Sequence, residues 1–152
     1  MKYLFYSEEL GWDYRAYEKY LDIARNQMPD DLVDLLSDTR LGFGEGSLHD
    51  SYIHRCAVCF SPLTRSCTES LREMNIELDL IGRFDDRLFQ LQYLDVTFVS
   101  CERPWTELHN LDVHELTLMD DGTYRHVMAY RNSTFTIVSR QVHFVERLLI
   151  SS

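Results

Sequence analysis

The sequence has no uncharged apolar run approaching the roughly 20 residues that a helix needs to cross a bilayer. The opening MKYLFYSEEL also lacks the basic start and the long apolar stretch of a signal peptide. Low-complexity tracts are missing too, and 45% of the residues are hydrophobic, which is typical of an ordered globular chain. These absences predict a cytoplasmic protein with no membrane segment.

Basic residues are scarce. The chain has 15 Lys and Arg against 25 Asp and Glu, for a net charge of −10, and residues 1–50 carry five basic and eleven acidic groups. Such a surface repels polyanions, so we expect no nucleic acid and no anionic membrane to bind through a broad basic face. The composition does not exclude a local basic pocket. A basic protein partner would be attracted.

Recognisable catalytic motifs are absent. The sequence contains no G-x-S-x-G, H-E-x-x-H, Walker loop or G-x-G-x-x-G. The run LGFGEGS at 41–47 has three glycines in five residues, but it follows a predicted helix and not a strand, so a phosphate cradle is not expected. We therefore expect no cofactor, and the missing motifs favour a protein that is not an enzyme.

The first part of the chain has a helical pattern. Apolar residues recur at three- and four-residue spacing and predict one buried helix stripe, made of Tyr14, Tyr17, Leu21, Ala24 and Met28. Asp13 is the expected N-cap, and Pro29 is expected to open a second, shorter helix whose positive end Asp30 and Asp31 complement. The tyrosines, including Tyr20, are expected in the core with hydroxyl groups that reach water.

After the glycine-rich run the apolar period changes to two, which predicts strands. Ile76, Leu78 and Leu80 alternate with acidic residues, as in a sheet with one wet face. In the next apolar stretch the parity changes at Tyr93, which predicts a bulge there. Asp120-Asp121-Gly122 predicts a tight hairpin, and the end of the chain is predicted to be a meander of about four strands.

Helices followed by strands predict an α+β fold. We expect one domain over 1–152, with a helical part at 1–45 and a β part at 46–152. It would hold two N-terminal helices followed by an antiparallel, meander-type sheet of about six or seven strands. The edge left by the terminal strand is a candidate surface for a homodimer.

Three local patterns carry a resemblance. They are the MKY start, the Leu48-His49-Asp50 step into the first strand, and Trp105 and Leu108 leading to the hairpin ELTLMDDGTYRHVMAY with its acidic-Gly-x-Tyr turn. In them the chain resembles an uncharacterised bacterial family of unknown function, which implies a fold and a bacterial source but no chemistry. Cys56, Cys59 and the stretch from Arg65 to Cys67 depart from the family's pattern.

Cys56 and Cys59 have the C-x-x-C spacing of a zinc knuckle or a redox motif. In a pleated strand their side chains point to opposite faces, so both could reach one metal only if the strand breaks at Ala57. No second C-x-x-C accompanies them. Free, packed thiols are therefore the expected state, for Cys67 and Cys101 as well.

His49 and Asp50 form the most site-like pair. A histidine beside a carboxylate after a glycine-rich loop can bind a metal or act as a general base. The structural alternative is that Asp50 caps a turn while His49 bonds the backbone.

The histidines His114 and His126 lie on the two arms of the predicted hairpin. A two-residue turn sets Thr117 opposite His126, so that the two imidazoles face opposite ways. A three-residue loop would set Leu116 opposite His126 and bring His114 diagonally beside it. The shorter loop is expected, so no metal site is expected at this pair.

Three acidic pairs are expected as solvated residues of turns or a helix start rather than as calcium ligands. They are Asp30-Asp31, Asp85-Asp86 and Asp120-Asp121.

Two function classes follow. The preferred hypothesis is a non-enzymatic interaction protein, of immunity or accessory type, whose acidic N-terminal helices engage a basic protein. Its candidate contact residues are Asp30, Asp31, Asp34 and Asp38. The competing hypothesis is a small metal-binding domain or enzyme centred on His49 and Asp50, with Cys56 or a sheet histidine as a further ligand.

Overall fold

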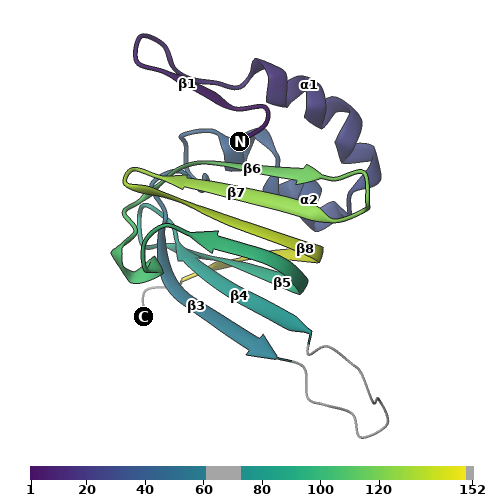
Figure 1. Cartoon of the computed structure of the whole chain (residues 1–152). Helices are drawn as coiled ribbons and strands as arrows, with labels where there is room; N and C mark the ends of the chain where they lie inside the picture. The colour runs from purple at the N-terminus through teal and green to yellow at the C-terminus, as the bar shows by residue number, and fades with distance from the viewer. Residues whose placement is uncertain (61–72, 150–152) are drawn as a thin grey trace, which may run out of the picture.

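The computed structural model describes residues 1–60 and 73–149. Its elements are β1 (Phe5–Ser7), β2 (Gly11–Asp13), α1 (Arg15–Ala24), η1 (Arg25–Gln27), α2 (Asp30–Leu35), α3 (Asp38–Leu41), β3 (Tyr52–Phe60), β4 (Met74–Ile81), β5 (Arg87–Cys101), η2 (Trp105–Glu107), β6 (Leu111–Leu118), β7 (Tyr124–Tyr130) and β8 (Ser133–Leu148). The predicted α+β class and antiparallel sheet are confirmed. Three α-helices stand where two were predicted, and a β1–β2 hairpin precedes them (Figure 1). Cys67 lies outside the described residues, and no helix of the described part is long and apolar enough to cross a membrane.

Three of the five residues of the predicted apolar stripe lie in α1, and Met28, which is also buried, lies after η1. Tyr17, Leu21 and Ala24 are buried, as their helical spacing requires. Tyr14 occupies the N-cap position instead of Asp13. The Asp13 carboxylate still accepts the N–H of Arg15, the first helical residue, at 3.0 Å. The acidic group therefore stays at the positive end of the helix, one residue before the cap.

The main sheet is antiparallel throughout, with the strand order β3-β4-β5-β8-β7-β6. Two three-stranded meanders, β3-β4-β5 and β6-β7-β8, are joined by the pairing of the long strands β5 and β8. The end of the chain, where the sequence predicted a meander of about four strands, forms the three strands β6, β7 and β8, because Ser133–Leu148 is one continuous strand. Because β8 lies between β5 and β7, the terminal strand is interior to the sheet, and the expectation that it forms an edge was wrong (Figure 1).

The predicted bulge of β5 lies after Tyr93 and not at it. Phe89, Leu91 and Tyr93 share one buried face, so the alternation continues through Tyr93. Asp95 then takes a left-handed conformation, with φ of 51°, and the register with β8 shifts just after Val96. Between Tyr93 and Val96 the buried side passes from odd- to even-numbered residues, and the opposite residues of β8, Val142 and Ser139, change parity with them.

The N-terminal part of the chain covers the outer edge of β6. The Tyr17 hydroxyl accepts the N–H of Leu116 at 2.8 Å and donates to the Leu116 carbonyl at 2.9 Å, while the Tyr20 hydroxyl accepts the N–H of Leu118 at 2.6 Å. The expectation that these hydroxyl groups reach water is therefore wrong. They take the place of a neighbouring strand, which an exposed edge would otherwise recruit.

A buried carboxylate anchors the residues before β1. Glu115 is fully buried on β6, and its two carboxylate oxygens accept the N–H groups of Lys2, Tyr3 and Leu4 at 2.7 to 2.9 Å. Three hydrogen bonds to one charged acceptor compensate the cost of burying it.

A second contact ties the helices to β8. β7 pairs with β8 only as far as Ser139, so the last part of β8 has one side without a strand among the described residues. On that side Asp31 of α2 accepts the N–H of Phe144 at 3.0 Å. The helices thus protect two parts of the sheet that lack a partner strand.

The buried Arg40 fixes the glycine-rich loop against this layer. Its guanidinium lies over the rings of Phe89 and Phe144 and pairs with Glu146 at 2.7 Å. It also donates to the carbonyl of Gly46 at 2.8 Å. Gly46 has a φ of +83°, and a Cβ there would lie 3.1 Å from an Arg40 nitrogen, so the loop needs glycine at this position.

Candidate functional site

A hollow lined by an excess of negative charge lies between α1 and α3, and we call it the acidic groove. It has a volume of about 520 Å³. Its lining consists of Tyr14, Tyr17, Glu18, Leu21, Asp22, Arg25, Asp38, Leu41, Gly42 and Phe43. Three carboxylates and one guanidinium therefore share the groove with aromatic and aliphatic side chains.

The one cation of the groove is bound by the chain itself. The Arg25 guanidinium donates to the carbonyl of Leu36 and lies 3.7 Å from Asp38. Among the described residues, neither Glu18 nor Asp22 forms an ion pair. Both are exposed and lie four residues apart on α1.

The two carboxylates interact differently with the dipole of their helix, because Glu18 lies in the first turn of α1, where a negative charge is favourable. Like charges at i and i+4 destabilise a helix by about 0.2–0.5 kcal/mol. Asp22 lies in the last turn of α1, at the negative end of the helix dipole, where no basic residue offsets it. The pair is therefore open to a cation from outside the chain.

The apolar side of the groove comes from the glycine-rich loop. Phe43 is 63% exposed, and its ring packs edge-on against the imidazole of His49 at 4.7 Å between centroids. Tyr14 also lines the groove, and burial raises the pKa of its hydroxyl to about 12, with a further effect from Asp112.

A second hollow adjoins the groove under the β1–β2 hairpin. It has a volume of about 540 Å³ and shares Tyr14 and Glu18 with the groove. Phe5, Tyr6 and Leu10 line it and are largely exposed. Together the two hollows form one acidic and aromatic surface on the N-terminal part of the chain.

The four aspartates proposed as partner contacts lie in different environments, and only one of them lines the acidic groove. Asp38 lines the groove and its side chain is fully exposed. Asp30 is exposed outside it, whereas Asp34 pairs with Arg40 at 3.2 Å and Asp31 accepts the Phe144 N–H. Of the four, only Asp38 lies in the groove.

His49 and Asp50 lie side by side, at 3.5 Å between Nε2 and a carboxylate oxygen. His49 Nδ1 donates to the backbone carbonyl of Asp112 at 2.7 Å, as the structural alternative predicts. The Asp50 carboxylate is mostly buried and lies 3.6 Å from Arg83 and 3.5 Å from Arg131. Two guanidiniums thus surround the carboxylate of this cluster.

This cluster is poorly suited to a metal ion. His49 Nε2 and the Asp50 carboxylate could each supply a ligand, but no third His, Cys, Asp or Glu of the described residues joins them in a metal-binding group. The two guanidiniums would also repel a cation. Asp50 has a φ of 62°, and its N–H donates to the carbonyl of Leu111, so the strained residue ties this loop to the start of β6.

The two C-x-x-C cysteines diverge. β3 continues through Ala57 without a break, because Cys56 pairs with Leu78 and Cys59 with Asn75 in one register. Cys56 is half-buried and Cys59 is exposed. Burial raises the pKa of the Cys56 thiol, with a smaller effect from Cys101, which disfavours the thiolate that a metal would need.

The predicted hairpin register of β6 and β7 was wrong. Leu116 lies opposite His126, and His114 lies opposite Met128, which is the register of the longer loop. The Met119 N–H donates to the Thr123 carbonyl, so that Asp120, Asp121 and Gly122 form a three-residue loop. Gly122 has a φ of +81° in this loop. The two histidines therefore share a face and lie diagonally beside each other.

The paired histidines form a buried polar chain with a tyrosine. Tyr93 Oη lies 2.7 Å from His126 Nδ1, and His126 Nε2 lies 3.1 Å from His114 Nδ1. His114 Nε2 has no hydrogen-bond partner among the described residues. Burial lowers the pKa of His114 to about 4 and that of His126 well below its usual value, with His114 adding to the second effect.

Comparisons of the chain with known protein families, with curated proteins and with solved structures find no match. The resemblance to a bacterial family therefore stays a prediction.

The sequence reasoning missed the groove residues Glu18, Asp22 and Phe43. A signal for two of them was present, since Glu18 and Asp22 are like charges at i and i+4 on a predicted helix. The position of Phe43 depends on the path of a glycine-rich loop, which no periodicity describes.

Proposed function

We propose that this chain is a cytoplasmic, non-enzymatic interaction domain of immunity or accessory type, and that its acidic groove binds a basic segment of a partner protein. The observation that carries the proposal is the carboxylate pair of Glu18 and Asp22. It is exposed, its two like charges repel each other, and it has no ion-pair partner in the described part of the chain.

The groove suggests the chemistry of the bound segment. A lysine or arginine would lie between the carboxylates of α1 and Asp38, and an aliphatic or aromatic neighbour would pack on Phe43. Apolar contact supplies affinity, while the charges steer the encounter and select the partner. The net charge of −10 attracts the same class of partner from a distance.

The proposal can be tested by selecting random peptides from a display library on the full chain. We expect the selected peptides to combine Lys or Arg with a neighbouring large apolar residue. Their affinity, measured by fluorescence anisotropy, should fall as salt is raised, because exposed charges are screened beyond about 8 Å at physiological ionic strength.

Two double variants locate the site. Glu18→Gln with Asp22→Asn should weaken peptide binding about tenfold, since two exposed pairs contribute roughly 0.2–1 kcal/mol each. Glu102→Gln with Glu107→Gln removes the same charge from exposed positions near η2 and should change binding little. Equal losses in both variants, salt-independent binding, or uncharged selected peptides would each refute the proposal.

The alternative of a metal-binding domain or enzyme at His49 and Asp50 has less support, because Arg83 and Arg131 surround the carboxylate. It predicts a rise in melting temperature when zinc is added, since a ligand of the folded state stabilises it by mass action. An unchanged melting temperature would remove the metal version.

A further inference from the structure

The two edges of the main sheet differ in how their backbone groups are covered by the rest of the chain. At the β6 edge, hydroxyl groups of Tyr17 and Tyr20 bond the backbone, and Glu115 holds the N-terminal residues beside the strand. At the other edge, β3 pairs with β4 alone among the described residues. The backbone groups on its outer side are thus available to another strand.

The β3 edge has few of the features that usually prevent strand addition. It is nine residues long, and it contains no proline, lysine or acidic residue. Tyr52, Val58 and Phe60 are 39%, 53% and 57% exposed on it. Its one irregularity is a register shift near its start, between Ile53 and Arg55. The remaining residues, 55–60, pair with β4 in one regular register, and residues 56–60 carry no charge.

The charge pattern indicates which partner fits this edge. The chain has 25 acidic residues, yet residues 51–68 contain none. The single charged residue of β3, Arg55, is already paired with Glu77 at 2.9 Å and Asp79 at 3.6 Å. A second copy of the chain would therefore meet no carboxylate on the pairing strand, although the two molecules repel each other at long range.

We propose that this chain forms a two-fold symmetric dimer by antiparallel pairing of β3 with β3 of a second copy, which joins two six-stranded sheets into one. A strand of nine residues offers roughly 30 Å of main-chain hydrogen bonding, at about 3.3 Å per residue. A two-fold axis through the edge makes the interface self-complementary, so one apolar, acid-free strand serves both sides.

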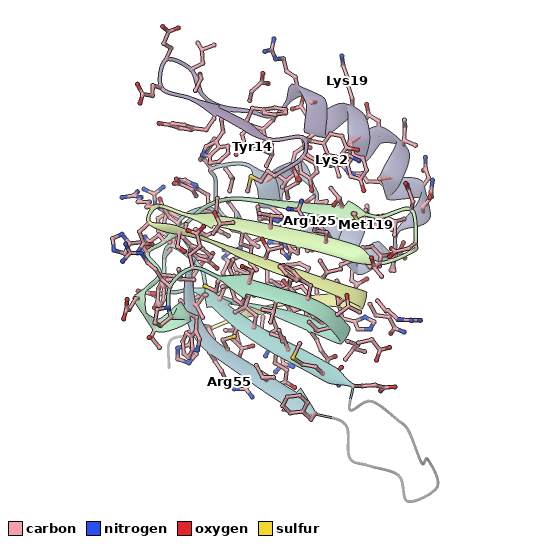
Figure 2. The ribbon with its side chains drawn as sticks, viewed as in Figure 1. Lys2, Tyr14, Lys19, Arg55, Met119 and Arg125 are labelled. Atoms are coloured by element: carbon pink, nitrogen blue, oxygen red, sulfur yellow. The ribbon has the colours of Figure 1, made fainter. Side chains whose placement is uncertain are left out.

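The dimer is independent of the function proposed above. Tyr14, which lines the groove, and Arg55 on β3 lie at opposite ends of the molecule (Figure 2). The two interactions also respond to salt in opposite ways. Groove binding weakens with salt, whereas the dimer strengthens, because salt screens the repulsion between two chains of charge −10.

Analytical ultracentrifugation of the full chain tests the proposal with a matched pair of variants. Val58→Lys places a charge on the β3 edge, whereas Val145→Lys makes the same change on the central strand β8 at a similar exposure, 50% against 53%. We expect the wild type and Val145→Lys to sediment at twice the chain mass of 18.0 kDa at micromolar concentration. Val58→Lys should dissociate at least tenfold more readily, with unchanged circular dichroism.

Amide hydrogen exchange gives a second measurement that does not depend on a variant. The outward-facing amides of β3, which do not bond β4, should be protected at high protein concentration and lose that protection on dilution, while the other amides of β3 and those of β4 and β5 should not change. A wild type that stays at 18.0 kDa at several hundred micromolar, equal dissociation of the two variants, or concentration-independent exchange of β3 would overturn the proposal.

Discussion

Acid should destabilise this protein through the buried pair of His114 and His126. Both side chains are enclosed by the sheet, and His114 Nε2 has no hydrogen-bond partner among the described residues. A proton added there would place a positive charge in an apolar interior without an acceptor. Tyr93, the other member of the chain, offers only a hydroxyl group, whose pKa burial raises well above its usual value.

The size of the effect follows from the pKa of His114. It falls from 6.5 in the unfolded chain to about 4 in the folded one, so the unfolded state binds more protons between these values. This contribution to stability is complete above pH 6.5 and is lost as the pH falls toward 4. Between pH 8 and pH 5 the loss from His114 alone is about 2 kcal/mol, against a total stability of roughly 5–15 kcal/mol.

Urea unfolding at pH 8 and pH 5 measures this loss. His114→Gln keeps a polar side chain of similar reach but does not titrate. Between pH 8 and pH 5 this variant should therefore lose about 2 kcal/mol less unfolding free energy than the wild type loses. His109→Gln removes an exposed histidine that lies outside the sheet and should follow the wild type. If the wild type and His114→Gln lose the same free energy on acidification, the buried pair does not control acid stability.

Three further predictions concern the edge covering and the glycine-rich loop. Glu115→Gln should lower the free energy of unfolding by about 2 kcal/mol, because one of its acceptor oxygens becomes a donor facing backbone N–H groups. Glu107→Gln, at an exposed site, should have no effect in the same urea titration. Tyr17→Phe should cost about 1–3 kcal/mol and speed amide exchange along β6, and unchanged exchange there would contradict the edge-covering role. Gly46→Ala should lower the melting temperature, because its φ of +83° and the nearby guanidiniums exclude a Cβ, whereas Gly44→Ala meets nothing within 4 Å and should be neutral or stabilising. A similar shift in both glycine variants would refute that reasoning.

Sequence periodicity located the secondary structure well where a single buried face decides it. The stripe through Tyr17, Leu21 and Ala24 predicted α1, and the alternation at Ile76, Leu78 and Leu80 predicted β4. These patterns are local, because a helix or a strand repeats its buried side at its own period. The excess of acidic residues is likewise a property of the composition alone.

Periodicity did not determine how the elements meet. The hairpin register that brings His114 beside His126 depends on one extra loop residue, which shifts every cross-strand pair. The insertion of β8 between β5 and β7 depends on pairing between residues far apart in the chain.

By itself, then, the sequence determined the α+β class, the buried faces of its longer elements and the sign of its charge, since each depends on neighbouring residues or on composition. Only the tertiary structure decided which carboxylates share a groove, which histidines are buried together and which sheet edge is left open. Those outcomes depend on packing between segments that the chain brings together only when it folds.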